Sequence, residues 1–440
     1  MTIDNTTLTD LNIFTADEGQ SIFEKLNFCN TTGGKDYLKK ILLKPHSQIE
    51  KIEAVQQTIQ FIEAHKQHWP INITNGAITV IERYYNSQID TPPHIPNPVN
   101  IYFYQLIHKH DYSLILFSAK QQYIFLQGMQ QLLNSWQATN TPNLLQVYLS
   151  NIATYLNDAT IKNILAKTQQ HHNISNSSLF ALGSYCLHRY KSSMLQLINI
   201  YYQLEAYLSL AIATNNLQLA YPTFNVQAST AYINATLLYH ILLPKPTAYN
   251  ITMAKSNNFI FLTGANMAGK STLIKAVGVA VYLAHIGMAV PAQQLTLSLY
   301  DGILSNINVT DNIAKGESYF YNEVQRIKNT VTKISNGNKW LVLIDELFKG
   351  TNVQDAMRCS TAVIEGLIKL QQNAFILSTH LYEISDHLKK YNNINFKYFE
   401  TKVENGILKF NYQLNNGVSN DRLGYLILQQ EGVVKLLDDL

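Results

Sequence analysis

A short glycine-rich segment is the feature that most constrains this chain. It reads FLTGANMAGKSTLIKAVG, between an apolar run and a helix-like run. The pattern G-x-x-x-x-G-K-[ST] is satisfied by Gly264, Gly269, Lys270 and Ser271. Glycines at these spacings let backbone N–H groups wrap around a triphosphate, and the following helix adds the positive end of its dipole. The sequence therefore predicts a phosphate-binding loop between a strand and a helix.

Each part of this loop has an expected role. Lys270 is placed for the β- and γ-phosphates of ATP, and Ser271 for Mg²⁺. We expect the nucleotide to contact the whole loop and the first helical turn, which comprise Gly264, Ala265, Asn266, Met267, Ala268, Gly269, Lys270, Ser271 and Thr272. ATP and Mg²⁺ are thus the expected substrate and cofactor.

Two further strand-like runs end in residues suited to the same chemistry. WLVLIDEL ends near Asp345 and Glu346, and NAFILSTH ends in Thr379 and His380. Ligands of open α/β sheets bind at the carboxyl ends of the strands, so these tips are expected to converge on the loop. We expect Asp345 to hold Mg²⁺, Glu346 to deprotonate the attacking water, and His380 to sense the γ-phosphate. Taken alone, the acidic pair could be a solvated strand end and His380 a polar cap.

The chain has two halves of different pattern. Residues 1–235 read as successive helices, with apolar residues at three- and four-residue spacing and a proline-rich break, QIDTPPHIPNPVN. In residues 236–440, short apolar runs alternate with helical stretches, which is typical of a parallel sheet covered on both faces. We therefore expect a multidomain α and α/β fold, with a helical domain followed by a P-loop α/β domain.

Composition narrows the class of protein. The 440 residues are 46% hydrophobic and 14% charged, as in a folded protein of more than one domain, and the net charge of +3 does not by itself indicate nucleic-acid binding. Three distant cysteines, Cys29, Cys186 and Cys359, read as buried thiols of a reducing compartment. No signal-peptide pattern opens the chain, and its longest apolar stretch, residues 276–292, is shorter than the ~20 residues of a membrane span. We expect a cytoplasmic protein that does not enter the membrane.

Around these motifs the sequence resembles the MutS family of DNA mismatch repair ATPases. TGANMAGKST is similar to the family's G-P-N-M-G-G-K-S-T, with Asn266 and Met267 at its distinctive positions. DNIAKGESYFYNEV, LVLIDELFKGTN and STHLYEI resemble three further family motifs in the same order. The resemblance is strong over residues 250–430 and weaker before them. It implies a helical lever domain at 1–235, a P-loop ATPase domain of ABC type at 236–440, and ATP hydrolysis coupled to lever movement on DNA in mismatch repair or recombination.

The resemblance also implies how the ATP site is completed. The family closes it with a serine from the opposing subunit, and Ser318 matches that serine. The resemblance therefore implies a homodimer with composite ATP sites. The position of Ser318 before a helical pattern is also typical of a helix N-cap. The family's mismatch-binding and connector domains have no counterpart here, and Phe348 and Lys349 replace its usual glycine and arginine. A short MutS-like branch that acts on DNA structure rather than on mispairs is therefore expected.

Other functions fit the sequence to different degrees. A nucleotide-switched scaffold with little DNA binding is compatible with the same ATP motifs. A transporter ATPase is not, because AKGESYF stands where an L-S-G-G-Q segment belongs. Residues 84–170 indicate no role: their scattered lysines could contact DNA or form a solvated face, and these are Lys109, Lys120, Lys162 and Lys167. Phe61-Ile62-Glu63 matches the letters of the family's mismatch-reading motif, but its helical pattern predicts a core Phe beside a surface Glu.

Overall fold

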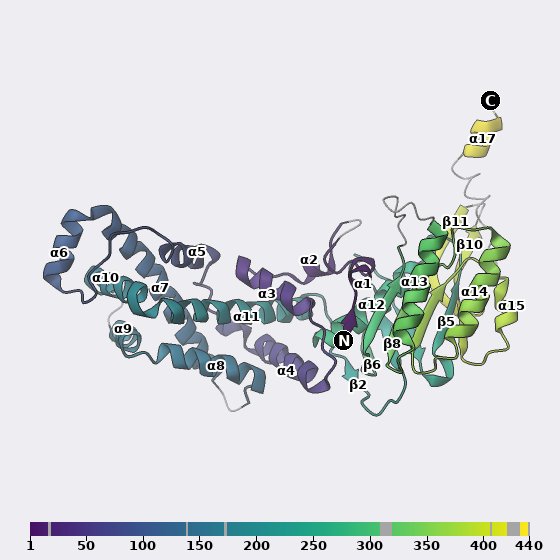
Figure 1. Ribbon diagram of the computed structural model, residues 1–440, viewed down its shortest axis with the longest axis horizontal. Helices are drawn as coiled ribbons and strands as arrows, with labels where there is room; N and C mark the ends of the chain where they lie inside the picture. The colour runs from purple at the N-terminus through teal and green to yellow at the C-terminus, as the bar shows by residue number, and fades with distance from the viewer. Residues whose placement is uncertain are drawn as a thin grey trace. The chain divides into compact units, whose positions relative to one another are not determined.

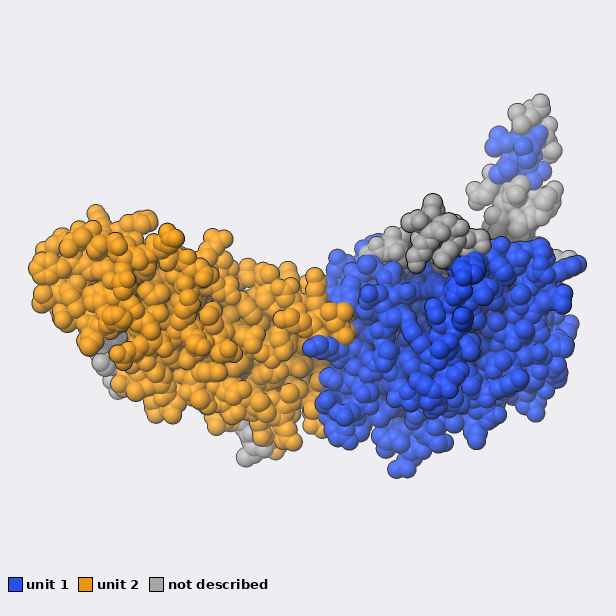
Figure 2. Space-filling view, viewed as in Figure 1, with its two compact units in different colours: residues 1–25, 44–53, 217–440 blue, residues 26–43, 54–216 orange. Residues whose placement is uncertain are grey.

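The computed structural model describes residues 1–15, 19–137, 140–170, 174–308, 319–404, 407–419 and 432–438. They form a mixed α and α/β protein, which confirms the expected combination of the two classes. The chain separates into two compact units (Figures 1 and 2). Unit 1 consists of residues 1–25, 44–53 and 217–440, and unit 2 of residues 26–43 and 54–216.

A seven-stranded sheet forms the core of unit 1. Its order is β1-β7-β8-β9-β5-β10-β11, and all neighbours run in parallel except the antiparallel pair β10 and β11. The strands are β1 (Thr2–Ile3), β5 (Phe259–Thr263), β7 (Gly302–Asn306), β8 (Trp340–Asp345), β9 (Ala374–Ser378), β10 (Ile394–Glu404) and β11 (Ile407–Asn416). The three apolar runs predicted as buried parallel strands are β5, β8 and β9.

Helices cover both faces of this sheet (Figure 1). Alternate residues of a strand point to opposite faces. Val342 and Ile344 of β8 share a buried cluster with α13 (Tyr319–Ile334), α14 (Val353–Leu367) and α15 (Ile384–Leu388). Leu343 points to the other face, beside Gly278 of α12 (Lys270–Ile286). Although α12 is almost wholly buried, no helix in the described part of the chain is long and apolar enough to cross a membrane.

A smaller sheet completes unit 1. Its order is β2-β6-β3-β4. These strands are β2 (Thr223–Phe224), β3 (Ile233–Leu238), β4 (Tyr249–Met253) and β6 (Gln294–Leu297). The remaining helical segments of this unit are α1 (Asn5–Asp10), a single turn at Lys255–Asn257 and α17 (Val433–Asp438).

The N-terminal residues belong to unit 1, so the division differs from the expected boundary at residue 235. Strand β1 pairs with β7 at the edge of the large sheet. The buried carboxylate of Asp10 accepts hydrogen bonds from the Ser305 hydroxyl and from the Asn308 backbone N–H. Residues 44–53 join the same unit, where His46 and His285 exchange two hydrogen bonds. Hydrophobic periodicity misses such contacts because the paired residues lie far apart in sequence.

Within its described residues, unit 2 consists of helices and their connections. They are α3 (Thr32–Leu42), α4 (Ile49–His65), α5 (Asn75–Tyr84), α6 (Pro98–Ile107), α7 (Lys109–Trp136), α8 (Asn143–Leu156), α9 (Ala159–Gln170), α10 (Asn176–Tyr185) and α11 (Lys191–Asn216), with single turns at Lys66–His68 and Cys186–Tyr190. The division between the units passes through α2 (Ile22–Leu26) and α4. The proline-rich break ends where Asn97 caps α6 and Pro98 opens it, because proline is tolerated at a first helical position.

Two smaller sequence predictions are met in part. Phe61 lies within α4 as predicted, but it is only half-buried, stacked on His65 and in a T-shaped contact with Trp136. Cys29 and Cys186 are buried thiols, whereas Cys359 is partly exposed.

Candidate nucleotide site

The glycine-rich loop joins β5 to α12, the context that the sequence predicts. Gly264 has a φ of 140° and Gly269 a φ of 107°, both in the region that favours glycine. A Cβ added to Gly264 would lie 3.1 Å from the carbonyl oxygen of Phe399. Met267 adopts a φ of 66° without being glycine, and its side chain is 79% exposed. The two glycines thus let the loop turn tightly against the neighbouring strand β10.

The side chains of the loop point in two directions. Ala265 and Ala268 are buried beneath it, so the two positions that differ from the family's proline and glycine keep the loop compact. Asn266 and Met267 are exposed on its outer side. The predicted nucleotide residues Asn266, Met267, Gly269, Lys270, Ser271 and Thr272 all line one pocket.

The Lys270 ammonium is held inside the loop. Its Nζ donates to the carbonyl oxygens of Gly264 at 2.8 Å and Ala265 at 2.9 Å. Burial lowers the pKa of Lys270, against the opposing attraction of the Glu346 and Asp345 carboxylates. The charge at the centre of the loop is therefore poorly hydrated, and an anion that enters the pocket would be attracted to it.

Asp345 joins the loop helix to two strands. It is the last residue of β8, and its register partner on β9 is Ser378. Its carboxylate accepts one hydrogen bond from the Ser271 hydroxyl and another from the Ser378 hydroxyl. The predicted metal ligands Ser271 and Asp345 are thus in direct contact, and both offer the oxygen atoms that Mg²⁺ prefers.

Glu346 stands beside Asp345 with both carboxylate oxygens engaged. One oxygen lies 2.7 Å from Nε2 of His380, and the other lies 2.9 Å from Nζ of Lys349. Burial would raise the pKa of Glu346, but hydrogen bonds from His380 and Lys349 outweigh it and lower the pKa to about 2. The backbone of Glu346 has a φ of 61°, a strained value for a non-glycine residue. The predicted base and the predicted sensor therefore meet, together with a lysine to which the sequence assigned no role.

His380 also approaches the loop lysine. Its Nε2 lies 3.4 Å from Nζ of Lys270, so the tip of β9 is close to both the carboxylate of Glu346 and the ammonium of Lys270. The imidazole is partly exposed, at 39% of its side-chain surface. The three strand tips that the sequence places at one edge of the sheet thus bring their polar side chains together.

A buried glutamate supports this end of the site. Glu323 of α13 accepts hydrogen bonds from the backbone N–H groups of Lys349 and Gly350. It therefore fixes the loop that carries Lys349 toward Glu346. Sequence reasoning gave Glu323 no role, although it lies within the motif DNIAKGESYFYNEV. Ser318, the other residue predicted from that motif, lies outside the residues that the structure describes.

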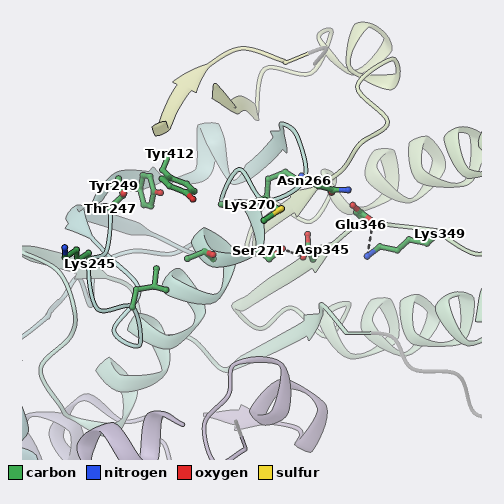
Figure 3. A pocket seen from close by; sticks show the side chains of 14 residues that line it. Lys245, Thr247, Tyr249, Asn266, Lys270, Ser271, Asp345, Glu346, Lys349 and Tyr412 are labelled. Atoms are coloured by element: carbon green, nitrogen blue, oxygen red, sulfur yellow. Dashed lines mark hydrogen bonds and ion pairs between the residues drawn. The ribbon is translucent and has the colours of Figure 1, made fainter. Parts of the chain in front are cut away.

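The pocket extends from the loop toward a group of side chains that the sequence did not single out. Its volume is about 510 Å³, within the range of small-molecule sites. The added lining residues are Leu243, Lys245, Thr247, Tyr249 and Tyr412. Figure 3 shows Thr247, Tyr249 and Tyr412 at one end of the pocket and Glu346 and Lys349 at the other. With 27 tyrosines in the chain, no sequence signal marks these two aromatic residues.

Comparisons with known proteins agree with this geometry. Residues 260–435 match the family model of MutS domain V. The DNA mismatch repair protein MutS of Shouchella clausii is 31% identical over 189 residues, which are 42% of this chain and 21% of that protein. The corresponding protein of Thermotoga maritima is 32% identical over 184 residues, 42% of this chain and 23% of that protein.

One similarity reaches further along the chain. The DNA mismatch repair protein MSH6 of Arabidopsis thaliana is 28% identical over 297 residues, which are 62% of this chain and 22% of that protein. These similarities span about a fifth of the length of each relative. The matched family model covers residues 260–435, which contain the loop from Asn266 to Thr272, the acidic strand end and the histidine strand end, so this part of the chain belongs to the MutS domain V family.

Proposed function

We propose that this protein binds and hydrolyses ATP and couples its nucleotide state to movement of the helical unit on DNA. The observation that carries the proposal is the convergence of Lys270, Ser271, Asp345, Glu346 and His380 on one side of a single pocket or directly beside it. The match to MutS domain V and the similarity to DNA mismatch repair proteins support ATP chemistry and a role related to DNA mismatch repair. The lever role of unit 2 rests on its helical composition and on the resemblance of residues 1–235.

Nucleotide binding follows from the charges and aromatic rings of the pocket. Lys270 would exchange its two carbonyl contacts for the β- and γ-phosphates, which are stronger acceptors. Tyr249 and Tyr412 supply flat rings at the far end for the nucleotide base. Ser271 and Asp345 would hold Mg²⁺, and the bound ion would neutralise charge on the phosphates. The residues present therefore fit ATP and Mg²⁺.

Glu346 is the residue that we propose activates the attacking water during hydrolysis. With a pKa of about 2 and a contact on each oxygen, the carboxylate is a weak base in this arrangement. Losing its contact with either Lys349 or His380 would raise its pKa and make it a stronger base for the attacking water. Lys349 lines the pocket, so its ammonium could turn toward a γ-phosphate and release the carboxylate at the same time.

A nucleotide-switched scaffold is the second candidate. The double engagement of Glu346 favours it, because a restrained base gives slow turnover and a long-lived ATP state. The lysines considered for DNA contact favour neither candidate: Lys109 and Lys120 are exposed on α7, Lys162 is exposed on α9, and the side chain of Lys167 lies outside the description. A basic surface for DNA is therefore not evident from these lysines.

DNA binding as a function of salt separates the two candidates. Fluorescence anisotropy would be measured on duplex, branched and single-stranded DNA, with and without ATP and Mg²⁺. For the DNA-acting ATPase, the logarithm of the binding constant falls linearly with the logarithm of salt concentration, and ATP changes it. ATP binding without salt-dependent affinity for any of the three DNAs would leave the scaffold as the function.

We also propose a homodimer with composite ATP sites. The support is the match of GESYF to the family motif, which assigns to Ser318 the role of contacting the γ-phosphate bound by a second copy. The test combines two variants with defects on opposite sides of the composite site, as set out below.

A further inference from the structure

Helix α6 carries apolar side chains on two opposite sides. Ile101 and Tyr104 are buried in unit 2, where the Tyr104 ring packs on Phe180 at 5.3 Å. The opposite side exposes apolar residues at three- and four-residue spacing, which places them on one stripe of a helix with 3.6 residues per turn. Together with the preceding Ile95, these form the α6 face: Ile95, Val99, Tyr102, Phe103, Leu106 and Ile107.

The α6 face is large for a surface that contacts only water. Its six side chains are between 56% and 79% exposed. We place their exposed area on the order of 600 Å², the upper end for the largest apolar patch of a monomeric protein. A helix with apolar residues on two opposite sides is ordinarily covered on both of them. Since unit 2 covers only one side of α6, the other side is suited to a partner.

The charge of the α6 face narrows the choice of partner. Residues 91–107 contain no Asp, Glu, Lys or Arg. A nucleic-acid backbone requires cations, and a strongly charged protein surface gains nothing from a neutral apolar one. A second copy of the same face meets no like-charge repulsion and matches it in apolar character. Two copies would bury about 1,200 Å², the lower limit of a specific protein interface.

We propose that the α6 face is a self-association surface, through which two copies of this chain pack their α6 helices across a two-fold axis. Each copy then presents the same patch to the other, as in an isologous dimer. Tyr102 and Phe103 supply the aromatic side chains that are enriched in the buried centres of interfaces. This contact lies wholly on unit 2, so it requires neither ATP nor Ser318 and is separate from the composite-site dimer.

Sedimentation velocity of the whole chain tests the proposal. All proteins would carry Lys270→Ala and contain no added nucleotide, so that the ATP sites do not contribute. The test variant is Leu106→Glu, at the centre of the stripe. The matched control is Gln105→Glu, which adds the same charge to the same helix at an exposed position beside the stripe. Phe103→Ser is a second, uncharged variant of the face.

The parent and the Gln105→Glu protein should dimerise with the same dissociation constant. Leu106→Glu should weaken the dimer by at least about tenfold, because it would bury two carboxylates against each other, and Phe103→Ser should weaken it less. Circular dichroism would show that each variant is folded. A parent that stays monomeric up to about 100 μM protein, or a dimer that Leu106→Glu leaves unchanged, would overturn the proposal. The proposal would also be overturned if the parent bound phosphatidylcholine vesicles and Leu106→Glu lost that binding while the dimer stayed intact, because the α6 face would then bind lipid instead of a second copy.

Discussion

The Nε2 atom of His380 lies 2.7 Å from Oε1 of Glu346, so the tip of β9 holds the carboxylate that follows β8. Strands β8 and β9 are neighbours in register, with Asp345 opposite Ser378, and this pairing brings the two side chains together. The contact joins two residues that the sequence assigned to separate tasks, the base and the sensor. The pKa of Glu346 therefore depends on the position of His380.

Replacing the proposed base should separate binding from chemistry. Glu346→Gln keeps the shape of the side chain and removes its charge. ATP should still bind, while hydrolysis falls by roughly 10²–10⁴-fold, as for loss of a general base. Single-turnover ATP hydrolysis and calorimetry measure the two effects, and Glu383→Gln, an exposed glutamate of the same unit, is the control. Unchanged turnover would move the base role elsewhere, with His380 the next residue to replace.

The same carboxylate predicts how stability depends on pH. The pKa of Glu346 is lowered from 4.5 to about 2 in the folded protein. Its ionised form therefore contributes stability that is fully present above pH 4.5 and is lost as the pH falls toward 2. Urea denaturation of the parent and of Glu346→Gln should give free energies of unfolding whose difference shrinks over this interval. A difference that stays constant down to the lower limit would contradict the contacts to His380 and Lys349.

Loss of the loop lysine should remove tight nucleotide binding. Lys270→Ala deletes the ammonium proposed to meet the phosphates, and a charge-assisted hydrogen bond contributes ~1.5–3 kcal/mol, or roughly a 10–150-fold change in affinity. Calorimetric titration with ATP would measure the loss, and circular dichroism would report the fold. Lys255→Ala is the control, because Lys255 is exposed on the same unit and does not line the pocket. Near-normal affinity in folded Lys270→Ala would remove the basis of the proposed function.

Tyr412 tests whether the far end of the pocket binds the base. Tyr412→Ala removes the ring and should weaken ATP binding by about 2–12-fold, for an aromatic contact of ~0.5–1.5 kcal/mol. Tyr412→Phe keeps the ring and should bind nearly as well as the parent. Inorganic triphosphate has no base, so its affinity should be the same for all three proteins. A loss of triphosphate binding in Tyr412→Ala would show that the substitution disturbs the loop instead.

A mixing experiment tests the composite site. Lys270→Ala and Ser318→Ala proteins, each inactive alone, would be combined. If each site uses Lys270 from one copy and Ser318 from the other, mixed dimers contain one site with both residues intact, and part of the ATPase activity should return. Mixed dimers, demonstrated with two affinity tags, that show no recovery would assign Ser318 to its own subunit or to no catalytic role.

The part of the site built from motifs could be predicted, and the part built from packing could not. The loop residues 264–272 and the strand tips Asp345, Glu346 and His380 follow from short patterns, because parallel strands must end at one edge of a sheet. Tyr412 comes from an antiparallel strand at the end of the sheet order, and Lys349 acts through a loop that Glu323 orders. Such residues meet the site only after the chain has folded, and nothing local distinguishes them.

The fold, too, could be predicted where a regular sequence pattern exists and not elsewhere. The buried strands and the helical first half follow from apolar spacing, and the proline-rich break follows from missing backbone donors. The N-terminal residues were misplaced because a two-residue strand such as β1 has no measurable period. The sequence pattern assigns no role to residues 98–107, and the predicted proline-rich break extends to Asn100, two residues past the start of α6 at Pro98.

The pairing of β1 with β7 also affects the order in which the protein folds during synthesis. Thr2 pairs with Gly302, so the first strand made waits for a partner that follows three hundred residues later. At ribosomal rates of ~5–20 residues per second, this delay is roughly 15–60 s. All of unit 2 is synthesised within it and can form its local helical contacts first. The nucleotide-binding sheet gains its edge strand only afterwards, and during the interval the N-terminal segment is exposed to chaperones and proteases.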